Sequence, residues 1–262
     1  MNTKNKQLTR DIIIATLVRA LKPLNYAHAF YEGGAAAFNR IDEWSDIDLY
    51  LVVDNQKVKN AFAIVEKTLK SLSPIKQKLE IPQTPWQGVS QAFYKLKNAS
   101  DYLLIDFCVL NLNASEKFLE PKMHGKVVFY FNKSGKIKPP RFDSEAFAKK
   151  VEERVKRLET RLEMFNAFVQ KEISRGNYLE AVDLYHVVTL ATLYEALRIK
   201  HNPIHHEFRT RYIHYELPPL VVEKLEQLSF VKDEKDLQKK FREATSWCHE
   251  VVAEIAKMSA AA

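Results

Sequence analysis

Two short stretches contain the strongest signal in this chain: YEGGAAAF at residues 31–38 and SDIDL at residues 45–49. The first has the pattern of a strand end, a pair of glycines and the start of a short helix. Glycines let a phosphate approach the backbone closely, and the free N–H groups at a helix N-terminus favour negative charge. The second stretch predicts a strand, so the carboxylates of Asp46 and Asp48 project from the same face. Two such charges favour a divalent cation between them, and Mg²⁺ prefers oxygen ligands.

A third carboxylate is predicted on a later strand. Asp106 is the only charged residue in the apolar run from Tyr102 to Leu110. A lone carboxylate in a buried strand is costly unless it is paired, protonated or bound to metal. Three converging carboxylates can hold two Mg²⁺ ions, one activating an attacking hydroxyl and one stabilising a pyrophosphate leaving group. Each part alone is more often a turn, a strand end or a hydrogen-bonded aspartate, and only their combination in this order indicates catalysis.

This combination resembles the DNA polymerase β-like nucleotidyltransferase superfamily. Its pattern is a Gly followed by Gly or Ser, a short helix, an Asp-x-Asp strand and a third acidic strand. The resemblance implies metal-binding catalytic carboxylates at Asp46, Asp48 and Asp106, and contacts to the triphosphate at Gly33, Gly34 and Ser45. Gly34 stands where many members have Ser, so a side-chain contact to phosphate is missing. The resemblance also implies ATP, or another nucleoside triphosphate, as the donor and about two Mg²⁺ ions as cofactors.

The rest of the chain predicts a change from mixed to helical structure. Helix and strand signals alternate in residues 1–138, and the polar, proline-containing stretch at residues 132–140 marks a boundary. Residues 139–262 have apolar positions spaced for helices. We therefore expect an α+β nucleotidyltransferase domain, a mixed sheet with flanking helices, at residues 1–138. An α-helical bundle on the acceptor side should follow at residues 139–262. This order resembles aminoglycoside and lincosamide nucleotidyltransferases, which adenylylate small molecules.

The predicted bundle offers a candidate general base. Asp183 and His186 lie three residues apart on one predicted helix, with Glu180 one turn before Asp183. In antibiotic-modifying relatives a carboxylate near the acceptor can serve as base, which makes Asp183 or Glu180 a candidate. Asp106 competes for the same role. The alternative for Asp183 and His186 is a buried polar pair that fixes helix packing.

A cationic stretch suggests a second class of function. Its members, which we expect to be mostly solvated, are Arg198, His201, His205, His206, Arg209, Arg211 and His214. They could face phosphates or an acidic acceptor, and their spacing does not favour zinc. The interval from Arg209 to His214 fits the loose Arg-x₄-His spacing of HEPN-type ribonucleases, helical bundles that often accompany small nucleotidyltransferases. An RNase, or a toxin–antitoxin-related protein, acting through the helical half is therefore the alternative. A nucleotide-binding module without turnover is a third.

Composition is that of a globular protein with 46% hydrophobic and 28% charged residues. The net charge of +7 suits an anionic ligand, although mixed charges of this kind also describe an ordinary surface. Two distant cysteines predict neither a disulfide framework nor a Cys-based zinc site, which favours the cytoplasm. The apolar run at residues 12–18 suits an amphipathic helix of the fold, and no run approaches the roughly 20 residues needed to span a membrane. The expected acceptor is a small molecule such as an antibiotic, with RNA and protein left open.

Overall fold

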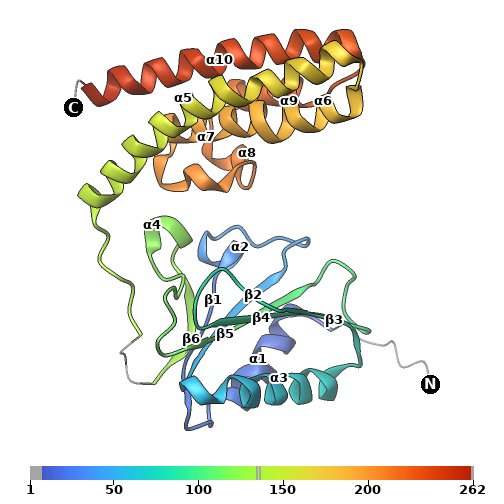
Figure 1. The fold of residues 1–262 in the computed structure, drawn as a ribbon. Helices are drawn as coiled ribbons and strands as arrows, with labels where there is room; N and C mark the ends of the chain where they lie inside the picture. The colour runs from blue at the N-terminus through green and yellow to red at the C-terminus, as the bar shows by residue number, and fades with distance from the viewer. Residues whose placement is uncertain (1–7, 134, 136, 261–262) are drawn as a thin grey trace. The chain divides into compact units, whose positions relative to one another are not determined.

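The structure is a computed structural model that describes residues 8–133, 135 and 137–260. It divides into two compact units, Met1–Phe142 and Asp143–Ala262, whose elements are labelled in Figure 1. The boundary between the units coincides with the N-terminus of the first helix of the second unit. The Asp143 side chain accepts a hydrogen bond of 3.0 Å from the backbone N–H of Ala146 and so caps the first helix of that unit.

The first unit is built on a six-stranded mixed sheet with the strand order β3-β4-β5-β2-β1-β6. Its strands are β1 (Ala27–Glu32), β2 (Ile47–Val53), β3 (Ile75–Ile81), β4 (Val89–Leu96), β5 (Ile105–Asn111) and β6 (Val128–Asn132). β2 and β5 are parallel, and the other neighbours are antiparallel. Both edge strands, β3 and β6, were missed by the sequence analysis. Five of the seven residues of β3 are exposed, so this edge strand lacks the buried apolar side chains that mark a strand of the core.

Two long helices cover one face of this sheet, α1 (Arg10–Leu21) and α3 (Val58–Leu72) (Figure 1). Ile47, Leu49 and Phe107 pack in the core on that side. Because successive strand residues point to opposite faces, Asp48 and Asp106 point to the other side. The shorter elements of the unit are α2 (Gly34–Ala37), η1 (Asn55–Lys57) and α4 (Pro121–His124).

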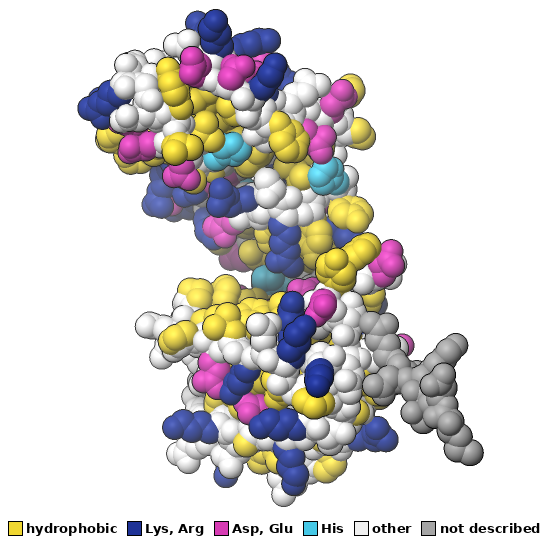
Figure 2. Space-filling model, turned by 90° about the vertical axis from the view of Figure 1, so that its right-hand side faces the viewer, with side chains coloured by type: hydrophobic (Ala, Val, Ile, Leu, Met, Phe, Trp, Pro, Cys, Tyr) yellow, Lys and Arg dark blue, Asp and Glu magenta, His cyan; other side chains and the backbone are white. Residues whose placement is uncertain are grey.

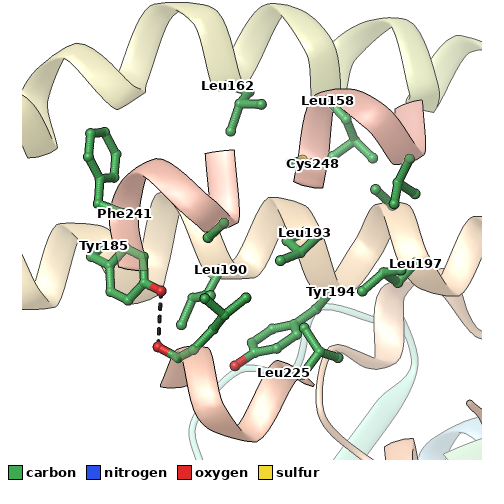
Figure 3. Close-up of a cluster of buried hydrophobic side chains, with 14 of the residues drawn as sticks. Leu158, Leu162, Tyr185, Leu190, Leu193, Tyr194, Leu197, Leu225, Phe241 and Cys248 are labelled. Carbon is green, nitrogen blue, oxygen red and sulfur yellow. Dashed lines mark hydrogen bonds between the residues drawn. The ribbon is translucent and has the colours of Figure 1, made fainter. Parts of the chain in front are cut away.

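The second unit is wholly helical within the described residues. Its elements are α5 (Ser144–Arg175), α6 (Tyr178–Leu184), the π-helical turn η2 (Tyr185–Leu190), α7 (Ala191–His201), η3 (Pro203–Phe208), α8 (Ile213–Glu216), α9 (Pro219–Ser229) and α10 (Glu234–Ala260). The single helix predicted to contain Asp183 and His186 is thus interrupted by a π-helical turn. α7 is central, since nine of its residues are buried. Figure 3 shows Leu193 and Leu197 of α7 among Leu158, Leu162 and Cys248 of the flanking helices.

No helix in the described part of the chain is long and apolar enough to cross a membrane. In Figure 2, Lys and Arg side chains lie scattered among neutral, apolar and acidic ones.

Candidate functional site

The centre of the site is a pair of carboxylates on neighbouring strands. Asp48 and Asp106 are partners in the register of the parallel strands β2 and β5, and each is the second residue of its strand. Adjacent strands lie about 4.8 Å apart, so the two side chains stand next to each other on the face opposite α1 and α3. Asp46 directly precedes β2 and acts electrostatically on Asp106. The structure therefore brings the three predicted carboxylates to one end of two strands.

Asp106 is held by a neighbour that the sequence analysis did not assign. Gln91 on β4 donates hydrogen bonds from Nε2 to both carboxylate oxygens, at 2.8 and 2.9 Å. Burial raises the pKa of Asp106 to about 6; the hydrogen bonds from Gln91 oppose that shift and the charge of Asp46 adds to it. Among the residues that the structure describes, no three His, Cys, Asp or Glu side chains are gathered around a common metal position.

Gly33 and Gly34 lie so close to the side chains of Tyr50 and Asp48 that neither position has room for a Cβ. Gly34 has a φ of +52°, and a Cβ placed on it would lie 1.6 Å from Oδ2 of Asp48. A Cβ on Gly33 would lie 2.9 Å from the ring of Tyr50. The N–H of Gly33 also donates to the carbonyl of Asp48 at 3.0 Å. The absence of a side chain at Gly34 therefore makes room for the Asp48 carboxylate, a reason that the sequence alone did not show.

Ser45 shapes the turn before β2. Its hydroxyl donates to Oδ1 of Asp42 at 2.7 Å and accepts from the backbone N–H of Asp42 at 2.9 Å. The same carboxylate oxygen accepts from the N–H of Trp44 at 3.0 Å, and these hydrogen bonds lower the pKa of Asp42. The hydroxyl thus has a structural partner, and its contact with a triphosphate stays a prediction.

A buried ion pair on the α1 side supports the start of β2. Arg10 of α1 pairs with Glu32 of β1, which is only 2% exposed, and donates to the carbonyl of Asp46 at 2.6 Å. The hydroxyl of Tyr130 donates to the other carboxylate oxygen of Glu32. Burial lowers the pKa of Arg10. Glu32 directly precedes Gly33 in an apolar strand, so the argument applied to Asp106 could have singled it out.

Two exposed aromatic rings come shortly before the carboxylates in the chain. Trp44 and Tyr102 are 59% and 63% exposed, and their rings meet edge to face with centroids 4.8 Å apart. Trp44 comes two residues before Asp46, and Tyr102 four residues before Asp106. In an edge-to-face pair each ring keeps at least one face that its partner does not cover.

Asp183 lies on α6 in the second unit, and both it and Glu180 are exposed. The expectation that Asp183 and His186 form a buried polar pair is therefore wrong. His186 instead packs edge to face against Tyr185, with ring centroids 5.5 Å apart. Because Asp183 is exposed and His186 contacts the ring of Tyr185, these two residues do not form the expected pair.

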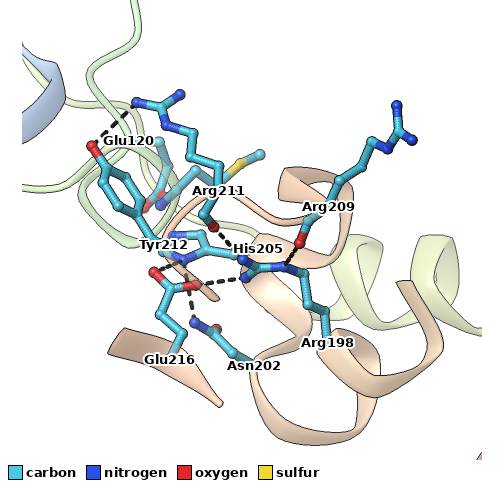
Figure 4. A network of polar contacts seen from close by, with 9 residues as sticks. Glu120, Arg198, Asn202, His205, Arg209, Arg211, Tyr212 and Glu216 are labelled. Carbon is cyan, nitrogen blue, oxygen red and sulfur yellow. Dashed lines mark hydrogen bonds and ion pairs between the residues drawn. The ribbon is translucent and has the colours of Figure 1, made fainter. Parts of the chain in front are cut away.

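The cationic stretch is also less solvated than expected. Arg198, His205 and His206 are buried, whereas Arg209 and His214 are exposed. Figure 4 shows Arg198 at the centre of a polar network. His214 lies 3.8 Å from Glu226, and the backbone carbonyl of Arg209 accepts from Arg198. The two residues of the Arg-x₄-His spacing thus have different surroundings.

Comparisons with known proteins add little to this geometry. No family model matches the chain, and no curated protein matches it. Among solved structures, an aminoglycoside 6-adenyltransferase from Bacillus subtilis is similar with a TM-score of 0.36 and 10% sequence identity. That match covers 99% of this chain and 92% of the other. With a likeness this distant, the function has to be inferred from the residues of the site.

Proposed function

We propose that this protein transfers a nucleoside monophosphate from a nucleoside triphosphate, with ATP as the default donor, to an acceptor hydroxyl. One observation supports this most: Asp48 and Asp106 stand in register at the start of two parallel strands, on one face of the sheet, with Asp46 directly before β2. The backbone of Gly34 lies directly against the Asp48 carboxylate. An oxygen-rich site next to a backbone without side chains suits a metal-bound triphosphate.

The carboxylate chemistry fits Mg²⁺, which Asp46, Asp48 and Asp106 would hold once their side chains turn towards a common position. Oδ2 of Asp106 accepts one hydrogen bond, from Gln91, and has a second lone pair for a cation, whereas Oδ1 accepts from both Gln91 and Sγ of Cys108. Burial raises the pKa of Asp106, and a bound cation would favour the charged carboxylate. When bound, Mg²⁺ neutralises the charge of the phosphates and of the leaving pyrophosphate.

The side chains of this protein would then orient the reactants. The acceptor oxygen attacks the α-phosphorus, an O–P bond forms, and the bond from that phosphorus to the pyrophosphate oxygen breaks. The hydroxyl proton passes to a carboxylate, for which Asp106 is the candidate in the first unit. Arg10 and Glu32 would act as positioning residues, because they hold the backbone at Asp46. The acceptor in this proposal is a small molecule such as an antibiotic.

The base of the nucleotide has a candidate platform in Trp44 and Tyr102. Stacking on an aromatic side chain contributes roughly 1–3 kcal/mol per base. Replacing Trp44 by Ala should therefore weaken Mg²⁺-dependent binding of ATP by about tenfold or more. Binding of inorganic tripolyphosphate, which has no base, should not change. Equal weakening of both ligands would place the base elsewhere.

The test of the reaction is pyrophosphate release with Mg²⁺ and each nucleoside triphosphate. The acceptor panel would contain aminoglycosides, lincosamides, tRNA and the protein itself. Release should depend on one acceptor and vanish in the Asp46→Asn/Asp48→Asn variant. Asp101→Asn, which removes an exposed carboxylate paired with Lys76, is the matched control and should remain active. A wild-type protein that binds no nucleoside triphosphate would exclude the proposal.

A further inference from the structure

A strained turn in the second unit contains an arginine where glycine is the usual residue. Arg209 has φ 53° and ψ −118°, and the N–H of Arg211 donates to the carbonyl of Phe208 at 3.0 Å. These are the dihedral angles of the first central position of a type II′ turn, which glycine dominates. Tyr212, just beyond the turn, also has a positive φ of 58°. A side chain at Arg209 therefore strains the backbone.

A buried network holds the strained turn in place. Arg198 is 0% exposed, and its Nε donates to the carbonyl of Arg209 at 2.5 Å while its Nη2 donates to that of Arg211. Its Nη1 donates to Glu216 at 2.6 Å, and the other oxygen of Glu216 lies 2.9 Å from Nδ1 of His205. Strained conformations persist where the surroundings over-determine them, and they cluster at functional sites.

The side chain of Arg209 has no role inside the fold. Figure 4 shows its guanidinium extending away from the network, and within the described residues it makes no hydrogen bond or ion pair. Arg211 differs, since its guanidinium stacks over Phe208 and Tyr212 at 5.3 and 4.9 Å from the ring centroids. Among the residues that the structure describes, no hydrogen bond, ion pair or ring contact of the Arg209 side chain thus offsets the strain that it causes.

We propose that Arg209 is a ligand-binding residue that recognises a phosphate group. A guanidinium presents a planar fork of donors that matches phosphate oxygens, and exposure leaves that fork accessible. The local charge favours a phosphate over a singly charged carboxylate, because a second arginine, Arg211, lies two residues away. The acidic neighbours have other partners: Glu216 pairs with Arg198, and Glu207 lies 3.8 Å from Lys150. This site belongs to the second unit alone and does not depend on the proposed transfer reaction.

Binding would be measured with two probes that present phosphate in different ways, inorganic tripolyphosphate and a short oligouridylate. EDTA in the buffer removes Mg²⁺, so the acidic site of the first unit repels both probes. The variants are Arg209→Gly, Arg209→Lys and, as a matched control, Arg157→Gln, which removes an exposed arginine of α5. Thermal unfolding of each variant would be followed in parallel.

Arg209→Gly should raise Tm by a few degrees, because glycine removes the strain, and should weaken binding of one probe by about tenfold. Arg209→Lys should bind more weakly than the wild type without a gain in Tm, since it retains the charge and the strain but not the fork. If Arg209→Gly weakens the binding of tripolyphosphate, the ligand is a small phosphorylated molecule. If it weakens the binding of oligouridylate, the ligand is a polynucleotide backbone. Unchanged affinity in Arg209→Gly, equal weakening in Arg157→Gln, or a wild type that binds neither probe would overturn the proposal.

Discussion

Replacing Arg198 by Met tests whether the buried network holds the strained turn. Methionine has similar length but no donors, so the carbonyls of Arg209 and Arg211 lose this donor and Glu216 loses its buried arginine partner. Breaking a buried ion pair by removing one partner destabilises by roughly 3–5 kcal/mol. Relaxation of the released turn returns roughly 1–3 kcal/mol of strain. Taking the middle of each range, the free energy of unfolding should therefore fall by about 2 kcal/mol.

Urea unfolding followed by tryptophan fluorescence measures this change in the second unit. Trp247 of α10 packs against the core there, with Nζ of Lys224 4.1 Å from its ring centroid. The other tryptophans, Trp44 and Trp86, are exposed, and replacing both by Phe leaves a single reporter.

A double-mutant cycle with Arg209→Gly separates the strain from the lost hydrogen bonds. Glycine should stabilise the protein while Arg198 is present, and stabilise it about 1 kcal/mol less in the Arg198→Met background. A free energy of unfolding for Arg198→Met within about 0.5 kcal/mol of its parent's would refute this account, because ordinary surface substitutions have effects of that size. Strict additivity of the two changes in the free energy of unfolding would refute it as well.

Three further predictions follow from single residues. Gly34→Ser should abolish most pyrophosphate release, because the new Cβ displaces the Asp48 carboxylate, while Gly176→Ser, at a positive φ with open space around it, should leave activity intact. Burial raises the pKa of Glu216, but its contacts with Arg198 and His205 lower it by more, so the net shift is downward. The protein should therefore lose stability to urea as pH falls below about 4.5, and a Glu216→Gln variant should lose less over that range, because other carboxylates with lowered pKa values, such as Asp236, still contribute. In the metal-free protein, carboxyl ¹³C NMR should show Asp106 titrating near pH 6, and added Mg²⁺ should lower that pKa; titration near pH 4 without metal would contradict the burial of this group.

Features that the sequence predicts have a signal in nearby residues of the chain, and most of the features that it misses do not. Asp106 stood out because a lone charge within an apolar strand is visible in the sequence, and Asp46 and Asp48 stood out by their two-residue spacing after the glycine pair. Glu32 is also a charge in an apolar strand, and the sequence analysis did not assign it a role. Arg198 gave the opposite error: a long cationic side chain is usually solvated, and nothing local shows that it is 0% exposed.

The sequence by itself determined the change from a mixed to a helical half and the strand positions of Asp48 and Asp106, although Asp46, predicted on the same strand as Asp48, directly precedes β2. Those features depend on periodicities of about two and 3.6 residues, which a chain encodes locally. Only the tertiary structure decided that Asp48 stands in register with Asp106, that Gly34 is shaped around a carboxylate, and that Arg198 holds a strained turn. Register, close approach and burial join residues far apart in the chain, so they are set by packing that no local pattern contains.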